Sequence, residues 1–494
     1  MIESPLVRRS QTWSAAHVNM NAIFLLALFA FAAADKAYER QLLNGAVQLT
    51  SKMYTEVVKS NPGKSVVLSA FSVLPPLAQL SLASVGESHD ELLHAMGLQN
   101  DNVKPQKKRF QTGNFDVNDE PRSGRPVTDK VDAILENVKQ DRHIDSYDIA
   151  KELGIDHKTV FIHLKKAEYT KKLDSWVPDK LTERNTRGVF PAINQQLQTI
   201  KGVELKLANK IYIPQAYQLN KQFATDVKTV FDSEVKNIDF TQNTEAAREI
   251  NQWVEDKTNN RIKNLVEPDS LGADTGAVLV NALYFKGSWK SKFDKALTTN
   301  RDFHVSADKT IKVPTMHKTD NFKYGQSDEL NAKLLEIPYE GGEASLLVVL
   351  PNDVEGLSVL EKKLNENPAL LVEATKRMHI NKIDVFLPKF TIETTTDLKQ
   401  VLQKIGVTKI FDANSARLEH LLDSDKPLFV SDAKQKAFIE VNEEGAEAAA
   451  ANVVMVLFKS ARVLRFSFVA DRPFLFGLKI ESPKTLLFSG TFRG

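Results

Sequence analysis

An alanine-rich stretch near the C-terminus constrains this chain more than any other feature of its sequence. Residues 446–451 read AEAAAA and follow directly on Gly445. Alanine is the best helix former, so intrinsic propensity alone favours a helix here. The surroundings favour an extended segment, because a β-rich run precedes Gly445 and several valines follow from Val453 onward. The stretch is therefore either a short helix or a segment of small residues between two strands.

The remaining pattern predicts an α+β chain with helices mainly early and strands mainly late. Apolar and amphipathic periodicity predicts helices over 38–60, 71–85, 87–97, 192–200, 218–230, 245–259 and 398–405. Alternating or β-branched runs predict strands over 65–68, 203–213, 278–285, 382–392, 437–442, 466–480 and 485–492. Gly341-Gly342 separates two further runs, 333–338 and 344–350, and predicts a hairpin.

Composition excludes several kinds of site. The chain has no cysteine, which excludes a disulfide framework, a cysteine zinc site and a cysteine nucleophile. Its 65 basic and 63 acidic residues give no overall bias toward nucleic acid or anionic membrane. We find no metal-ligand spacing, phosphate-binding loop or nucleophile elbow. We therefore expect neither an enzyme nor a metal or cofactor site.

The N-terminus has the pattern of a secretion signal. Residues 22–34 read AIFLLALFAFAAA, a short apolar run that ends in small residues before the charged Asp35. Thirteen apolar residues are too few to span a bilayer comfortably, so the run predicts a cleaved signal peptide, and a buried helix is the alternative. The signal would begin more naturally at Met20, which makes residues 1–19 a candidate artefact of the gene model. We assign residues 1–34 to an upstream extension plus signal and predict a secreted, extracellular protein without a membrane span.

Several separated motifs, in the right order, resemble the serpin family of protease inhibitors, and insect serpins above all. The alanine-rich stretch ends the most telling of them, KAFIEVNEEGAEAAAA, over residues 436–451. The others are VVLSAFSVLPPLAQLSLASVG (66–86), NALYFKGSW (281–289), LPKF (387–390) and ADRPFLF (470–476). The resemblance covers about 35–104 and 189–494. It implies the serpin fold, with three sheets, about nine helices and an exposed reactive-centre loop, here over residues 443–470.

The resemblance also implies a mechanism, in which the loop is cut by the target protease and inserts as a new strand into the main sheet. The inward side chains of such a strand must be small and uncharged. The implied hinge consists of Glu443, Glu444, Gly445, Ala446, Ala448, Ala449, Ala450 and Ala451. Glu447 is charged, but in an alternating strand it lies on the opposite face from Ala446 and Ala448. The serpin itself supplies no catalytic residue, because the nucleophile belongs to the protease.

In serpins the number of residues between the hinge glycine and the cleaved bond is nearly fixed, and in this sequence that number leads to a lysine. Fourteen residues beyond Gly445 lies Lys459, so the implied reactive bond is Lys459–Ser460. Counting back from Asp471 favours Arg462–Val463 instead, because the segment after Lys459 is about three residues longer than usual. Either bond suits a trypsin-like protease, whose specificity pocket ends in an aspartate. The alternative is that both basic residues are merely solvated loop charges.

Residues 105–188 do not look serpin-like and resemble part of the DNA-binding region of mariner-type transposases. The matching stretches are 109–126, 131–173 and WVPDKL within 176–185. Helices predicted over 128–139, 146–153 and 157–168 have the layout of a helix-turn-helix, so we expect a small all-α insert. By resemblance, the DNA-contacting residues are Arg122 and Arg125 in a minor-groove linker and His157, Lys158, Thr159 and His163 in the major groove.

We predict a monomeric, secreted inhibitor that traps trypsin-like serine proteases as a covalent acyl complex. Bulky, charged or proline residues at 446–451 would have favoured the alternative of a non-inhibitory serpin, and the hinge has none on its inward face. An inactive chimera is a further alternative. The last alternative is residual DNA binding by the insert. We do not expect it, because the nearly balanced charge of the insert gives little attraction to the DNA phosphates.

Overall fold

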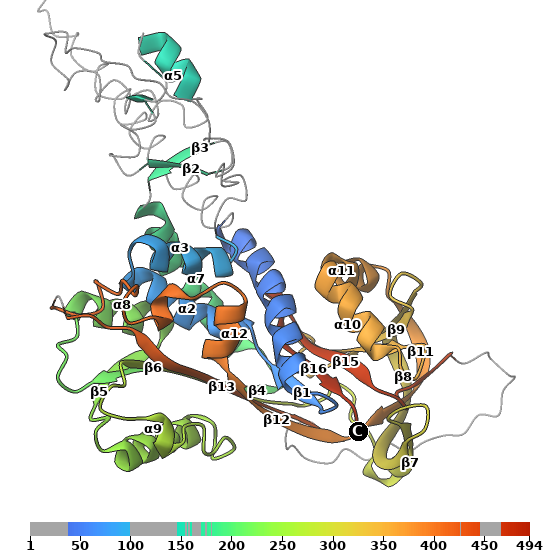
Figure 1. Ribbon diagram of the computed structural model, residues 1–494. Helices are drawn as coiled ribbons and strands as arrows, with labels where there is room; N and C mark the ends of the chain where they lie inside the picture. The colour runs from blue at the N-terminus through green and yellow to red at the C-terminus, as the bar shows by residue number, and fades with distance from the viewer. Residues whose placement is uncertain are drawn as a thin grey trace, which may run out of the picture. The chain divides into compact units, whose positions relative to one another are not determined.

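The computed structural model describes residues 38–98, 146–153, 156, 159–160, 169–172, 175–178, 180–424, 426–444 and 466–494. The chain divides into two compact units, one of residues 1–98 with 189–494 and one of residues 99–188. The larger unit contains two sheets and most of the helices (Figure 1).

A five-stranded sheet forms one half of the larger unit, in the order β12-β13-β6-β4-β5. Its strands are β4 (Val203–Pro214), β5 (Glu234–Ile238), β6 (Ala277–Gly287), β12 (Phe390–Asp397) and β13 (Val430–Val441). Nearly every residue of β6 is buried, because this central strand is covered on both faces. Helix α9 covers one face of the sheet, and α2, α8 and α12 cover the other (Figure 1).

A nine-stranded sheet forms the other half, in the order β1-β16-β15-β10-β9-β8-β11-β14, with β7 paired to β8 off this path. Its strands are β1 (Val66–Leu68), β7 (Thr299–His304), β8 (Thr310–Ser327), β9 (Ala332–Pro338), β10 (Ala344–Pro351), β11 (His379–Pro388), β14 (Phe466–Val469), β15 (Phe474–Glu481) and β16 (Lys484–Phe492). Strand β8 is long enough to pair with β7 at its start, with β9 at its end and with β11 along its middle. It therefore joins two groups of strands into one hydrogen-bonded sheet.

The helices surround these sheets. A helix runs from residue 38 through residue 60, and the others are α2 (Leu74–Ala83), α3 (Gly86–Ala95), α7 (Lys180–Thr199), α8 (Lys221–Phe231), α9 (Asn243–Lys257), α10 (Leu357–Glu366), α11 (Ala369–Lys376) and α12 (Leu398–Lys404). Short 3-10 turns occur at η1 (Phe71–Val73), η2 (Pro268–Ser270), η3 (Lys295–Leu297) and η4 (Lys409–Phe411). Among the described residues, no helix combines the length and apolar character that a bilayer span requires.

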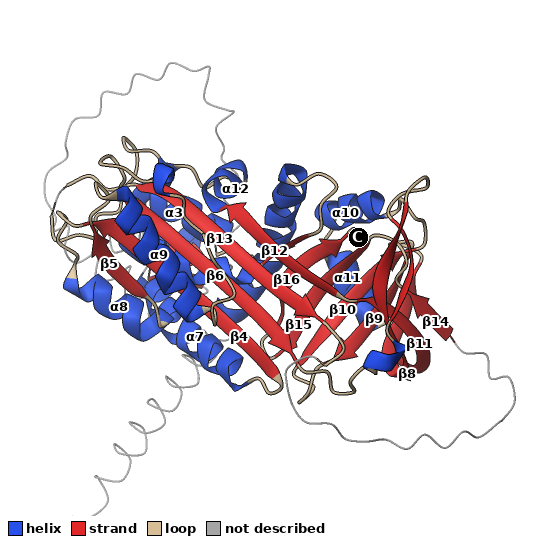
Figure 2. Cartoon of the chain, turned by 90° about the horizontal axis from the view of Figure 1, so that it is seen from below, coloured by secondary structure: helices blue, strands red, loops and turns tan. Residues whose placement is uncertain are grey.

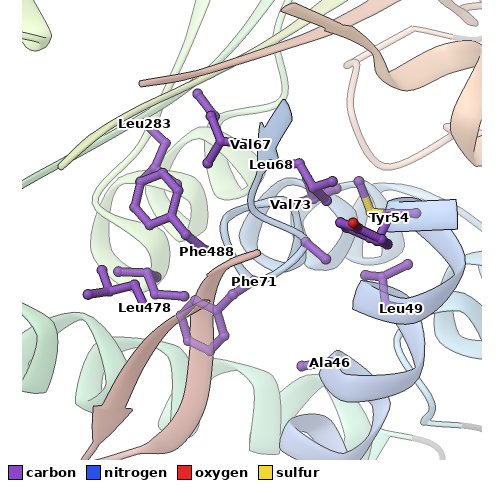
Figure 3. Packing of buried hydrophobic residues seen from close by; sticks show 14 of the residues in the cluster. Ala46, Leu49, Tyr54, Val67, Leu68, Phe71, Val73, Leu283, Leu478 and Phe488 are labelled. Atoms are coloured by element: carbon purple, nitrogen blue, oxygen red, sulfur yellow. The ribbon is translucent and has the colours of Figure 1, made fainter. Parts of the chain in front are cut away.

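The main core lies where the two sheets meet the helix over residues 38–60. Leu283 of β6 and Phe488 of β16 face residues of β1 and η1, with Ala46 and Leu49 of the long helix close by (Figure 3). These side chains are buried and come from five separate stretches of the chain. Burial of this apolar surface is the main stabilising term of the fold.

The α+β fold predicted from the sequence is confirmed, as is the hairpin at Gly341-Gly342. Strands β9 and β10 pair as antiparallel neighbours, and both glycines have positive φ values, +83° and +77°, that other residues rarely adopt. The single strand predicted over 466–480 is wrong, because Ala470 to Pro473 interrupt it and the proline ring removes a ladder donor. The strand predicted over 382–392 is likewise two strands, β11 and β12, separated at Lys389 and belonging to different sheets.

One helix extends well beyond its predicted start. Helix α7 begins at Lys180, whereas the sequence predicted a helix from Ala192. Val189 and Phe190, ahead of the proline at 191, are buried against the core, so tertiary packing stabilises helical structure where propensity alone gave no signal.

The smaller unit contains helix α5 (Ser146–Leu153) and an antiparallel pair, β2 (Tyr169–Lys172) with β3 (Ser175–Pro178). Helix α5 matches the prediction over 146–153. The prediction of an all-α insert is wrong, since Tyr169, Trp176 and Val177 have high strand propensity and lie in this hairpin. The helices predicted over 128–139 and, except for residues 159–160, over 157–168 lie outside the described residues.

Candidate functional site: the end of β13 and the parallel strand pair beside it

Strands β13 and β6 lie side by side and run in the same direction at the centre of the five-stranded sheet (Figure 2). Their register runs from Val430 opposite Ala277 to Glu440 opposite Lys286. A chain that turned back after β13 and entered between the two strands would run antiparallel to both. One parallel ladder would then become two antiparallel ladders, which are the more stable kind per residue.

Glu443, just beyond the end of β13, is held in place by an ion pair with Lys389, in which the carboxylate is buried and the lysine side chain is about half exposed. The Glu443 side chain is 4% exposed and accepts hydrogen bonds from Lys389 Nζ at 2.9 Å and from Thr298 Oγ1 at 2.9 Å. Burial alone would raise the pKa of the Glu443 carboxyl, but these hydrogen bonds and the positive charge of Lys389 outweigh it and lower that pKa. Glu444, the next residue, pairs with Lys295 at the surface.

Trp289 anchors the backbone at the same point. Its indole Nε1 donates to the Asn442 carbonyl at 2.6 Å, and its ring stacks on Tyr339 with the centroids 4.4 Å apart. The backbone N–H of Phe293 donates to the Glu443 carbonyl at 3.0 Å. The chain leaving β13 is therefore fixed through Glu443, and the hinge begins at a rigid support.

A buried polar cluster crosses the β6–β13 pair below this support. Asn281 of β6 and Gln435 of β13 face each other in register, both 0% exposed, and Gln435 Nε2 donates to Asn281 Oδ1 at 2.7 Å. Ser72 of η1 donates to the same oxygen at 3.0 Å, Gln435 also bonds the Ser69 carbonyl at 2.8 Å, and Asn281 donates to Asn209 of β4. Separating β6 from β13 would break this cluster, since a buried polar group without a partner is costly.

The sequence patterns did not predict this polar cluster. Its signal is faint: Asn281 is the one strongly polar residue of the apolar run 278–285, and Gln435 precedes a similar run in β13. A lone amide in a buried strand indicates a satisfied hydrogen-bond network, but the sequence does not say where its partners lie.

The remaining predicted hinge and reactive-bond residues lie outside the described residues. These are Gly445, Ala446, Ala448, Ala449, Ala450, Ala451, Lys459, Ser460, Arg462 and Val463. The chain is described again from Phe466, where β14 pairs in parallel with β11 at the edge of the nine-stranded sheet. Residues 445–465 therefore connect β13, an interior strand of the five-stranded sheet, to β14, an edge strand of the nine-stranded sheet.

Of the predicted DNA-contacting residues, Thr159 alone lies within the described part of the chain. It is exposed, and its backbone N–H donates to the Asp156 carboxylate at 3.3 Å in a helix-capping contact. Arg122, Arg125, His157, Lys158 and His163 lie outside it. Within the described ranges, no group of three or more His, Cys, Asp or Glu residues is placed to hold a metal ion.

The comparisons with known proteins agree with this architecture. The model of the serpin (serine protease inhibitor) family matches residues 44–493. This chain belongs to the serpin family. Antichymotrypsin-2 of Bombyx mori is 46% identical over 452 residues, which are 91% of this chain and 97% of that protein. Antitrypsin of Bombyx mori is 44% identical over 472 residues, 95% of this chain and 98% of that protein.

A solved structure supports the same fold. Serpin48 of the insect Tenebrio molitor, described as a highly specific serpin, aligns with a TM-score of 0.68 at 28% identity and covers 92% of this chain and 98% of its own. The serpin recognised from the motifs is thus confirmed, and serpins act as inhibitors of proteases rather than as catalysts. The five-stranded sheet with β6 and β13 in direct contact is this serpin's main sheet, and no strand lies between them.

The ion pair at Glu443 gives a first prediction. Replacing Glu443 by Gln removes the charge from a buried carboxylate that accepts from Lys389 and Thr298, so we expect a loss of about 1–3 kcal/mol in stability. The melting temperature at neutral pH should fall accordingly. Because the pKa of Glu443 is lower in the folded state than in the unfolded state, the stability that its charge adds to the wild type is fully present above the unfolded-state pKa. This added stability should be lost as the pH falls through the folded-state pKa of Glu443. The melting temperatures of the wild type and of Glu443→Gln, measured from neutral to acid pH, should therefore converge.

The matched control for that prediction is Glu444→Gln. Glu444 also pairs with a lysine, but its side chain is 41% exposed, so its removal should leave the melting temperature unchanged. Equal losses for both variants would contradict a special role for the buried Glu443 carboxylate.

Proposed function

We propose that this serpin inhibits trypsin-like serine proteases by inserting its cleaved loop between β6 and β13. The observation that carries the proposal is the alanine-rich sequence 446–451, which follows β13 after four intervening residues, a strand whose end is anchored and which pairs in parallel with β6. Small, uncharged side chains are the ones that can enter a sheet whose central strand is buried on both faces. The hinge composition thereby opposes the non-inhibitory alternative.

The proposed chemistry takes place on the target protease. The protease serine attacks the carbonyl carbon of Lys459, the Lys459–Ser460 bond breaks, and the new amine leaves on Ser460 with the proton transferred by the protease histidine. Lys459 is then joined to the protease as an ester, which water would normally hydrolyse. At about 3.3 Å per residue, residues 446–459 span roughly 46 Å once extended. Insertion therefore carries the protease far enough to distort its active site before hydrolysis.

The driving force resides in the serpin. Insertion exchanges one parallel ladder for two antiparallel ladders and adds buried surface in the main sheet. The hydrogen bonds of Asn281 and Gln435 oppose insertion, because they must break before the new strand can enter between β6 and β13. The native chain is therefore a metastable state that is released by cleavage.

A mixing experiment tests this proposal. Purified protein incubated with trypsin should give a band of summed mass that survives denaturing electrophoresis, and mass spectrometry should locate cleavage after Lys459. The covalent band follows because insertion outruns hydrolysis of the ester. Complete cleavage without that band would contradict inhibition and favour a non-inhibitory serpin or an inactive chimera.

Two further parts of the chain complete the proposal. The apolar run over 22–34 supports secretion to the extracellular space, with residues 1–34 absent from the mature inhibitor. Residues 105–188 are a transposase-derived insert without an activity of their own, placed between serpin segments 35–104 and 189–494. An insertion at a surface connection costs little stability when the inserted piece folds by itself.

A further inference from the structure

Phe466 is an exposed aromatic residue at the edge of the nine-stranded sheet. It is the first residue of β14, the last strand in the order of that sheet (Figure 2). The residue is 54% exposed, and within the described ranges no other phenylalanine is exposed to this extent. A single exposed apolar residue is common on protein surfaces. What distinguishes Phe466 is its support and its distance along the chain from the proposed cleaved bond.

A neighbouring tyrosine supports the Phe466 ring. The centroids of the Tyr324 and Phe466 rings lie 5.9 Å apart in a tilted arrangement. Tyr324 is 7% exposed, and its hydroxyl accepts a hydrogen bond from Gln326 Nε2 at 2.6 Å. The backbone of Phe466 is held as well, because it pairs with Ile383 of β11. Phe466 therefore presents an exposed ring on a fixed support, and little side-chain entropy is lost when a partner covers it.

The chain between the proposed cleaved bond and Phe466 is short. Phe466 is six residues beyond Ser460, and six extended residues span at most about 22 Å. A protease domain of about 230 residues has a radius of gyration of about 17 Å, so it is roughly 45 Å across. A protease that holds the bond in its cleft therefore extends about as far as Phe466 on the side of the residues that follow the bond. Cleavage at Arg462–Val463 would bring Phe466 closer still.

We propose that Phe466 is a docking residue for the target protease and contacts an apolar side chain on the rim of its cleft. The inference rests on the proposed function, because the partner is the protease that the loop attracts. An aromatic ring that is half exposed before docking has apolar surface to bury, and such rings supply much of the binding energy at protein interfaces. The contact selects among proteases independently of the residue at the cleaved bond.

This contact belongs to the complex that forms before cleavage. After cleavage the protease is joined to Lys459 and moves with the inserting segment, whereas Phe466 stays in β14. The contact with Phe466 is then broken in every molecule. It therefore governs how tightly and how fast the protease is captured, and not the fraction of captured protease that is trapped.

The test uses the full chain and trypsin whose nucleophilic serine is replaced by alanine, which binds the loop without cutting it. Fluorescence polarisation of labelled inactive trypsin measures the dissociation constant. Phe466→Ser should weaken binding by about three- to tenfold, the range for loss of one aromatic contact. Phe466→Tyr keeps the ring and should bind like the wild type. With active trypsin, the second-order rate constant for Phe466→Ser should fall by the same factor at an unchanged stoichiometry.

The matched control is Ile380→Ser on β11. Ile380 is 71% exposed and pairs with Lys323, next to the pair of His379 with Tyr324. Because side chains alternate along a strand, Ile380 faces the opposite side of the sheet from Tyr324 and Phe466. Its replacement also removes exposed apolar surface, but it should leave the dissociation constant for inactive trypsin unchanged.

Each outcome has one meaning. An unchanged dissociation constant for Phe466→Ser overturns the docking role, and so does an equal weakening in Ile380→Ser. Weakening that Phe466→Tyr does not restore would show that position 466 acts through the structure of β14, which also overturns it. A wild type that binds inactive trypsin but forms no covalent band with active trypsin contradicts the proposed function alone, since the dissociation constants still report on Phe466. A wild type that does not bind inactive trypsin contradicts both.

Discussion

Replacing Ala448 by Arg should convert this inhibitor into a substrate of its own target. In the inserted strand the inward side chains face the main core, which the odd-numbered residues of β6 and β13 line with Leu279, Leu283 and Ile439. A charge at 447 is already present in the natural hinge, so 446, 448 and 450 are the inward positions. An arginine at 448 would have to enter this core without a partner.

The size of the effect follows from that burial. An uncompensated buried charge costs about 3–5 kcal/mol, which slows insertion by a factor of about a hundred or more. Hydrolysis of the ester then overtakes insertion, and each protease molecule cleaves many serpin molecules before one is trapped. Titration of trypsin activity should give a stoichiometry at least about tenfold above the wild-type value, with cleaved serpin replacing the covalent band.

Glu447→Arg is the matched control for Ala448→Arg, because it places the same side chain one position earlier on the opposite face. That face is the one of Glu440 and Lys286, both partly exposed near the end of the strands, so we expect an unchanged stoichiometry. Full trapping by Ala448→Arg would show that insertion does not limit inhibition. A loss in both variants would point to a general effect of charge in the hinge.

The sequence predicted most of what local pattern can encode. The Gly341-Gly342 hairpin depends on two adjacent residues that tolerate positive φ, and the buried strand β6 on a run of apolar residues, so both are visible in a short window. The hinge was predicted from the resemblance of residues 436–451 to the serpin motif, because the alanine-rich stretch alone also allowed a helix. The pairing of β13, which precedes the hinge, with β6 is a property of the assembled sheet.

The supports of the hinge were not predictable from the sequence, because they join distant segments. Gln435 and Asn281 are 154 residues apart, and Trp289 is 153 residues from the Asn442 carbonyl it bonds. Lys389, Thr298 and Glu443 likewise come together only once both sheets have formed. Hydrophobic periodicity specifies which face of a strand is buried, but not which strand lies next to it.

Replacing Lys459 by Ala should abolish the inhibition of trypsin, whereas Arg462→Ala should leave it intact. A trypsin-like specificity pocket ends in a buried aspartate, and a lysine at the cleaved bond neutralises it. Removal of one partner of a buried ion pair costs about 3–5 kcal/mol, so the second-order rate constant for trypsin inhibition should fall by at least about a hundredfold. Stopped-flow or progress-curve kinetics with trypsin measure this constant for all three proteins.

The pair of variants also decides between the two ways of counting along the loop. Counting from Gly445 selects Lys459, and counting back from Asp471 selects Arg462. Lys459→Phe offers a positive test of the first count, because an aromatic side chain should redirect inhibition to a chymotrypsin-like protease whose pocket is apolar. If Arg462→Ala were the inactive variant and Lys459→Ala remained an inhibitor, the reactive bond would be Arg462–Val463. The inserted strand would then be longer by the three residues that separate these two positions, with the protease class unchanged.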